Sequence, residues 1–175
     1  REQSARDARN ALAIDADAPI PRFVLATIAC HDQKFADAAE SFRRILRTGN
    51  PSAGDGLDRA EVSRELGICL YKMKEYDEAA EAFSMAAAGR DDDAMVRLFL
   101  GNALAHSGRF ELAHDAYKAA LERDPDLADA RGNVEIMAVE IGYRHFDSGR
   151  PVEALALVPP QTTNTELLFL KAVSE

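Results

Sequence analysis

Tryptophan is absent from this 175-residue sequence, and cysteine occurs only twice. Cys30 and Cys69 stand far apart and make neither a metal-ligand motif nor a disulfide framework, so we expect buried free thiols. The β-branched residues that sheets prefer number 20, against 32 alanines, and alanine is the strongest helix former. The composition therefore predicts an all-α protein and argues against a sheet.

Positive charge is also scarce. The 21 basic side chains are outnumbered by 30 acidic ones, which gives a net charge of −9. Binding to phosphate backbones needs clustered lysine and arginine, so nucleic acid is not an expected partner. No apolar run approaches the roughly 20 residues that cross a bilayer, and we expect no membrane insertion of this segment.

Arrangements of residues that support catalysis are missing too. His31, His106, His114 and His145 are scattered, with no second ligand at metal-binding spacing. The serines lack a nucleophile-elbow context, and no glycine-rich loop follows a strand. The sequence therefore predicts a protein that is not an enzyme and that uses no metal and no other cofactor.

An internal repeat with a period of 34 residues decides the architecture. Residues 60–93 align with residues 94–127 without a gap, and nine of the 34 pairs are identical. Two further pairs, Tyr76/Phe110 and Phe83/Tyr117, keep an aromatic side chain. Each copy is therefore expected to fold as one structural unit.

The pattern within each copy predicts two helices joined by a turn. Leu66, Gly67 and Leu70 share one stripe of the first helix, and Phe83 lies among alanines on one stripe of the second. A glycine inside a helix costs about 1 kcal/mol, so Gly67 indicates the close approach of a neighbouring helix. A single hairpin would expose an apolar face, and we therefore expect the hairpins to stack into an array.

The spacing of these residues resembles the tetratricopeptide repeat. In the second copy it runs through Leu100, Gly101, Leu104, Gly108, Phe110, Ala113, Tyr117, Ala120 and Pro125. The first copy departs from the family pattern where Lys74 replaces the turn glycine and Asp91 replaces the proline, and both copies lack the family's tryptophan. The resemblance implies an all-α fold, a right-handed superhelix of antiparallel helix-turn-helix repeats (an α-solenoid).

Extending the register covers nearly the whole chain as a single array. The expected segments are a partial repeat (second helix) at 1–18, a repeat at 19–52, an insertion at 53–59, repeats at 60–93 and 94–127, a degenerate repeat with an extended first helix at 128–162, and the start of a further repeat or a capping helix at 163–175. The chain starts at Arg1 rather than methionine and both ends fall inside repeat units, so we expect a piece of a longer array. The cytoplasm is the favoured compartment, and the periplasm stays open because the native N-terminus is expected to be missing.

The expected binding surface is the side of the first helices that faces away from the leucine stripe. In proteins of this family that side lines a concave groove, and an apolar groove suits an amphipathic helix or an extended apolar segment. The residues expected in the groove are Phe23, Thr27, Cys30, Arg64, Ile68, Tyr71, Lys72, Met95, Leu98, Phe99, Asn102, His106 and Tyr143. For Ile68, Leu98 and Phe99 a place in the core is an equal alternative.

One type of ligand known for this family is not expected here. Some tetratricopeptide domains hold the C-terminal carboxylate of a chaperone through lysine, asparagine and arginine. Asn102 sits where such an asparagine would, but Leu98 replaces the lysine one turn earlier. Glu140 falls where the next copy would supply a second asparagine, and its charge would repel a carboxylate. We therefore expect no tight binding of acidic C-terminal peptides.

The expected function is that of a scaffold or adaptor that binds a peptide or helical segment of a protein partner. Two alternatives stay open. One is a chaperone of the bacterial type III secretion class. The other is a structural spacer that assembles into homo-oligomers, including envelope or polysaccharide-export assemblies.

Overall fold

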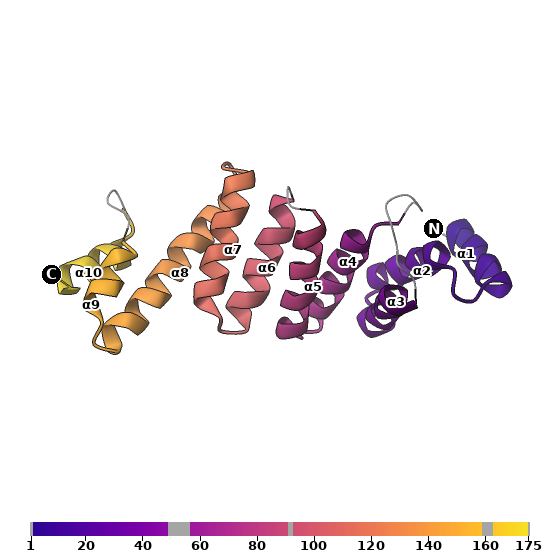
Figure 1. The fold of residues 1–175 in the computed structure, drawn as a ribbon, viewed down its shortest axis with the longest axis horizontal. Helices are drawn as coiled ribbons and strands as arrows, with labels where there is room; N and C mark the ends of the chain where they lie inside the picture. The colour runs from indigo at the N-terminus through magenta and orange to yellow at the C-terminus, as the bar shows by residue number, and fades with distance from the viewer. Residues whose placement is uncertain (1, 49–56, 91–92, 159–162, 175) are drawn as a thin grey trace. The chain divides into compact units, whose positions relative to one another are not determined.

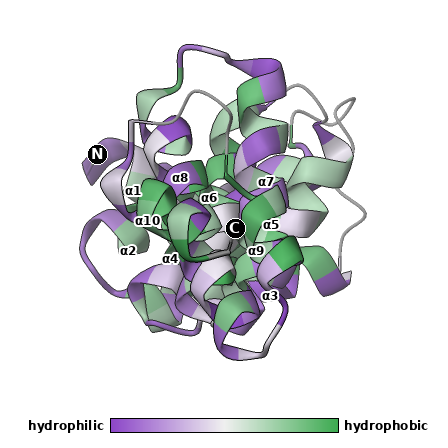
Figure 2. Ribbon diagram, turned by 90° about the vertical axis from the view of Figure 1, so that its left-hand side faces the viewer, coloured by the Kyte–Doolittle hydropathy of each residue, from purple (hydrophilic) through white to green (hydrophobic). Residues whose placement is uncertain are grey.

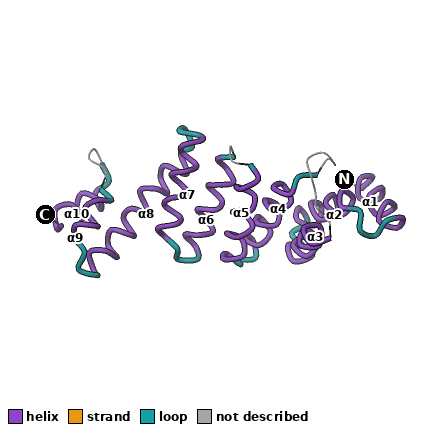
Figure 3. The backbone as a smooth tube through the Cα atoms, in the orientation of Figure 1, coloured by secondary structure: helices purple, strands orange, loops and turns teal. Residues whose placement is uncertain are grey.

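The structure is a computed structural model that describes residues 2–48, 57–90, 93–158 and 163–174. Within these ranges every regular element is an α-helix, so the all-α prediction is confirmed (Figure 3). The chain divides into two compact units, Arg1–Val96 and Arg97–Glu175. Residues 53–56 of the predicted insertion and Asp91 lie outside the described residues.

The first unit is built from helices that pack against their neighbours in chain order. These helices are α1 (Glu2–Ile14), α2 (Pro19–His31), α3 (Phe35–Thr48), α4 (Arg59–Lys72) and α5 (Tyr76–Gly89) (Figure 1). Helices α2 and α3 form one hairpin and α4 and α5 another, and α2 also contacts α4. The largest side chains buried in this unit are Phe42, Ile45, Leu70 and Phe83.

The second unit has a different arrangement at its C-terminal end. Helix α6 (Ala94–His106) begins at the end of the first unit, and it is followed by α7 (Phe110–Arg123), α8 (Ala128–Asp147), α9 (Pro151–Ala156) and α10 (Thr165–Ser174). Helix α7 packs on α8, and α9 and α10 pack both on α8 and on each other. Green and purple segments lie side by side along the helices in Figure 2, as expected where one side of each helix is buried.

One type of turn ends the first helix of every hairpin. Its central residue has a positive φ: 62° at Gln33, 64° at Lys74, 76° at Gly108 and 71° at Gly149. The following amide donates a hydrogen bond to the carbonyl five residues earlier, for example Glu75 N–H to the Leu70 oxygen at 3.0 Å. This is a Schellman turn, in which glycine is preferred. It recurs after 41, 34 and 41 residues, which places the same structural register in all four hairpins.

The glycines of the repeat pattern mark close contacts between helices. A methyl group on Gly67 would lie 2.7 Å from ring carbons of Phe83, and one on Gly101 would lie 2.5 Å from the Tyr117 ring. In the last hairpin a methyl group on Gly142 would meet Leu170 Cδ1 at 2.7 Å. An α10 side chain therefore lies against Gly142, where the earlier hairpins use an aromatic residue of their own second helix.

Helix α8 is longer than the other first helices, with 20 residues against 13 in α6. Its extra length is close to two turns of 3.6 residues, so the residues beyond it keep the same orientation about the helix axis. Buried residues continue along the helix, from Ala130 near its start to Gly142 near its end. The lengthened helix thus preserves the packing face of the repeat.

Candidate functional site

The start of α4 is held by a charged cap. The Asp58 carboxylate accepts a hydrogen bond from the Ala60 amide at 3.0 Å and another from Arg90 Nε at 2.9 Å. The hydrogen bond from the Ala60 amide is the main cause that holds the pKa of Asp58 below its usual value, and the hydrogen bond from the Arg90 guanidinium is the second. In return Asp58 raises the pKa of Arg90. The cap links the two ends of the α4–α5 hairpin and fixes where α4 begins.

Helix α4 is buried around most of its circumference, and one side stays partly open. Buried residues along the helix include Val62, Ser63, Leu66 and Leu70. The accessible side, here called the α4 stripe, consists of the half-buried Glu61, Arg64, Glu65, Ile68 and Tyr71 and the exposed Lys72. Their spacing of three or four residues places them along one face of the helix. Apart from the exposed Arg59 in the first turn, the accessible residues of α4 lie on this stripe, and the four predicted groove residues of α4 are among them.

The stripe combines charge with an aromatic surface. Arg64 Nη2 lies 3.0 Å from Glu65 Oε1, while Arg64 Nε is buried without a hydrogen bond. The Tyr71 ring packs edge-on against Tyr76 with ring centroids 5.4 Å apart. Burial, with Tyr76 as a second cause, raises the pKa of Tyr71, so its hydroxyl stays protonated at neutral pH. Such a surface can bind a segment by apolar contact and by hydrogen bonds from Arg64.

The predicted groove residues of α2 are half-buried and partly engaged within the unit. The Phe23 ring centroid is 5.6 Å from that of the buried Phe42 on α3. The Thr27 hydroxyl donates a hydrogen bond to the Phe23 carbonyl at 2.9 Å. Cys30 Sγ lies 3.2 Å from Cys69 Sγ of α4. The structure thus brings α2 and α4 together at these two cysteines, a contact that the sequence analysis did not predict.

In the second unit Asn102 is the centre of a polar cluster. Its Oδ1 accepts hydrogen bonds from the Tyr117 hydroxyl at 2.9 Å and from Asn133 Nδ2 at 3.2 Å. Asn133 lies on α8 and was missed in the sequence analysis, because no matching asparagine occurs in the other copies. The half-buried Asn102 is therefore oriented by contacts inside the unit, and its own amide group remains a donor for a ligand.

Leu98 corrects the predicted groove, because only 3% of it is exposed. Helix α6 is apolar on nearly every side, and such a helix is buried on more than one face. Of the two places that the sequence left open for Leu98, the structure supports the core. The remaining predicted residues are accessible: Met95 and His106 are exposed, and Phe99 and Tyr143 are half-buried. A single groove through both units stays a prediction.

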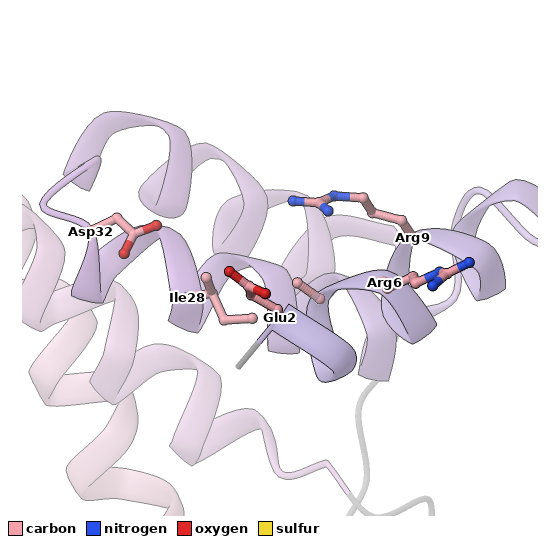
Figure 4. A pocket seen from close by; sticks show the side chains of 6 residues that line it. Glu2, Arg6, Arg9, Ile28 and Asp32 are labelled. Atoms are coloured by element: carbon pink, nitrogen blue, oxygen red, sulfur yellow. The ribbon is translucent and has the colours of Figure 1, made fainter.

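A hollow of about 690 Å³ lies between α1 and α2, lined by Glu2, Ala5, Arg6, Arg9, Ile28 and Asp32 (Figure 4). Figure 4 shows the two arginines on α1 and the carboxylates of Glu2 and Asp32 on either side of Ile28. The two positive and two negative side chains give the hollow no preference for one sign of charge. We therefore assign it no ligand.

The described residues contain no cluster of three or more histidine, cysteine, aspartate or glutamate side chains that could hold a metal ion. Nor does any helix in the described ranges have the length and hydrophobicity required to cross a membrane.

Comparison with known proteins places the repeat pattern in a family. The tetratricopeptide repeat model matches residues 32–94 and 66–128, which together cover more than half of the chain. The peroxisomal targeting signal receptor of Yarrowia lipolytica is 43% identical over 112 residues, covering 64% of this chain and 19% of the receptor. The receptor of Candida albicans is 39% identical over 83 residues, covering 47% of this chain and 14% of the receptor. The chain thus spans less than a fifth of the length of these curated relatives.

Solved structures agree on the fold. The structure of YrrB, described as a TPR protein with an unusual peptide-binding site, superposes with a TM-score of 0.71 at 21% identity and covers 98% of this chain and 83% of YrrB. The second TPR domain of human RPAP3, in complex with the HSP70 peptide SGPTIEEVD, gives a TM-score of 0.57 at 18% identity, covering 69% of this chain and 98% of that domain. At these identities the likeness establishes the fold alone.

Proposed function

Because the chain belongs to the tetratricopeptide repeat family, we propose that it is an adaptor module that binds a short peptide segment of a partner protein and catalyses no reaction of its own. The observation that carries this proposal is the α4 stripe. Apart from Arg59 in its first turn, helix α4 is buried on its other sides, and its accessible side presents Arg64, Ile68 and Tyr71 together. Arginine and tyrosine are enriched among the residues that dominate binding energy at protein interfaces.

The curated relatives support a peptide as the partner, because their name describes receptors for a targeting signal. A C-terminal Ser-Lys-Leu is the general peroxisomal address. Its lysine suits a chain with a net charge of −9 and two glutamates, Glu61 and Glu65, on the α4 stripe. We therefore propose a neutral or basic peptide, rather than an acidic one, as the ligand.

The test starts from peptides that the protein selects itself. A random-peptide phage library panned on the wild-type chain is expected to yield neutral or basic sequences. Synthetic versions are then measured by fluorescence anisotropy, beside a peptide ending in Ser-Lys-Leu and the acidic peptide SRMEEVD. We expect Tyr71→Ala and Arg64→Ala each to weaken binding of the selected peptides about tenfold or more, which is about 1.4 kcal/mol.

The matched control is Met85→Ala on α5, which removes an exposed apolar side chain (42% exposed) away from the α4 stripe. This variant is expected to bind with wild-type affinity. Selected peptides whose affinity is unchanged in both stripe variants contradict the assignment of the surface. Preferential binding of SRMEEVD contradicts the proposed charge of the ligand.

Self-association is a second candidate function, favoured by one observation on α10. Leu168, Phe169 and Val173 are 45%, 56% and 39% exposed, while Leu167 and Leu170 on the same helix are fully buried. Exposed apolar residues clustered on one helix are typical of contact surfaces. Light scattering of the wild type and of Phe169→Asp tests this candidate. A dimer that becomes a monomer in the variant supports it, and a wild-type monomer at high concentration rules it out.

A further inference from the structure

The chain's two cysteines meet inside the first unit. Cys30 lies in the last turn of α2 and Cys69 lies in α4, 39 residues later. Both are free thiols, and their Sγ atoms are 3.2 Å apart. The two side chains therefore point at each other across the contact between the first helices of neighbouring hairpins.

We propose that Cys30 and Cys69 form a reversible intramolecular disulfide that joins α2 to α4, with a small disulfide such as oxidised glutathione as the oxidant. A disulfide has an S–S length of about 2.05 Å. The two sulfurs need to approach by roughly 1 Å, a movement within the reach of side-chain rotation and small helix shifts. The bond can thus form within the existing fold.

The surroundings of the two thiols set the order of the reaction. Cys69 is 0% exposed, whereas Cys30 is half-buried. Burial, with the neighbouring Cys30 thiol as a second cause, raises the pKa of Cys69 well above its usual value. Since the thiolate is the attacking species, an accessible thiol reacts before a buried one. Cys30 therefore meets the oxidant first, and Cys69 acts as the resolving thiol.

The chemistry proceeds in two exchange steps. The Cys30 thiol loses its proton to solvent, and its sulfur attacks one sulfur of oxidised glutathione, which breaks the glutathione S–S bond and releases one glutathione thiolate. Cys69 then loses its proton, and its sulfur attacks Cys30 Sγ and expels the second glutathione. The two released thiolates take up the two protons. In total, two protein thiols are oxidised to one disulfide and one glutathione disulfide is reduced to two glutathione molecules.

The bond would have a defined structural effect. It closes a loop that contains all of α3, and such a cross-link restricts the unfolded chain. It also fixes the spacing of α2 and α4 directly beside Ile68 of the α4 stripe. The oxidised first unit is therefore expected to unfold at a higher temperature than the reduced one, whether or not a peptide binds there.

The test uses the wild-type chain, because two cysteines allow one intramolecular pairing. Reduced protein at low concentration is incubated in glutathione buffers of increasing oxidation, then acid-quenched and analysed by intact mass and thiol titration. We expect a monomer lighter by two hydrogen atoms, with no free thiol, that melts at a higher temperature and returns to the reduced form with dithiothreitol. A stable glutathione adduct on Cys30, a dimer linked through Cys30, or two thiols that persist in the most oxidising buffer overturns the proposal.

Two variants separate the roles of the sulfurs. In Cys69→Ala the resolving thiol is gone, so Cys30 is expected to accumulate as the glutathione adduct. In Cys30→Ser the buried Cys69 is expected to remain unmodified under the same conditions. Comparable adduct formation at Cys69 in Cys30→Ser would contradict the proposed order. Native circular dichroism spectra of both variants verify that the fold is retained during the measurement.

Discussion

The two compact units build the same kind of hairpin with different residues. In the α4–α5 hairpin of the first unit, Gly67 contacts Phe83 of the adjacent helix, but the turn forces Lys74 into a positive φ. In the last hairpin of the second unit the turn has Gly149, but the contact at Gly142 is made by Leu170 of α10, beyond the short helix α9. The α4–α5 hairpin thus combines a local helix contact with an unfavourable turn, and the last hairpin has the reverse.

This difference indicates which contacts stabilise each of the two hairpins. A contact between adjacent helices forms with little loss of chain entropy, whereas a contact with a later helix requires the intervening segment to be ordered first. The α4–α5 contact should therefore form without the docking of any later helix. The last hairpin should depend on the docking of α10.

Truncation of Phe83 and Leu170, the side chains that contact Gly67 and Gly142, has the largest expected effect on stability. Phe83→Ala should lower the free energy of unfolding of the first unit by about 3–5 kcal/mol, and Leu170→Ala should cost about 2–5 kcal/mol. Hydrogen exchange should show that Phe83→Ala weakens protection throughout α4 and α5, while Leu170→Ala weakens protection in α9, α10 and the C-terminal part of α8. Equal loss of protection in all helices for both variants would refute the comparison.

Filling the glycine contacts should separate the two hairpins further. In Gly67→Ala the new methyl group meets a rigid aromatic ring at 2.7 Å, whereas in Gly142→Ala it meets the end of a flexible leucine. Overpacking costs about 1–3 kcal/mol, and removal of a helical glycine returns about 1 kcal/mol. Urea unfolding should therefore show Gly67→Ala as destabilised and Gly142→Ala as close to the wild type. The reverse order would contradict the assigned contacts.

Exchange of the turn residues Lys74 and Gly149 should change the stability of the two hairpins in opposite directions. Lys74→Gly relieves a left-handed conformation of a residue with a side chain, and we expect a gain of about 1 kcal/mol. Gly149→Ala introduces the same conformational cost and should lose about 1 kcal/mol. Thermal melts of both variants provide the measurement. A destabilised Lys74→Gly would mean that the lysine side chain stabilises the turn by other contacts.

Substitution of the capping residues of α4 and α10 has the smallest expected effect on stability. Asp58 caps α4 with a charge, whereas the neutral Asn164 side chain accepts hydrogen bonds from the Glu166 and Leu167 amides at 3.0 and 3.2 Å. Because the folded pKa of Asp58 is lowered, its stabilisation is complete above the unfolded value of 3.8 and is lost as the pH falls through the folded pKa. Asp58→Asn should remove this part of the acid dependence, and Asn164→Ser should leave it unchanged. Unfolding measured between pH 7 and pH 2 tests both.

The sequence predicted those contacts that a repeated pattern encodes. Gly67 and Gly101 stand at matching positions sixteen residues before an aromatic residue, so their partners could be inferred. The partner of Gly142 could not, because α9 ends early and no repeated spacing points to Leu170 on α10. The contact between Cys30 and Cys69 was missed for a related reason, since the other copies have no matching cysteine pair. Leu98 was misplaced because α6 is apolar on nearly all sides, which leaves its periodicity ambiguous.

The α4 stripe is the surface that we propose for peptide binding. The most direct test of this proposal is a titration of the ¹⁵N-labelled chain with a selected peptide, followed by NMR chemical shifts. We expect the largest changes at Arg64, Ile68 and Tyr71, with little change at Met85 or Phe169. Changes centred on the exposed residues of α10, with the α4 stripe unaffected, would contradict the proposal.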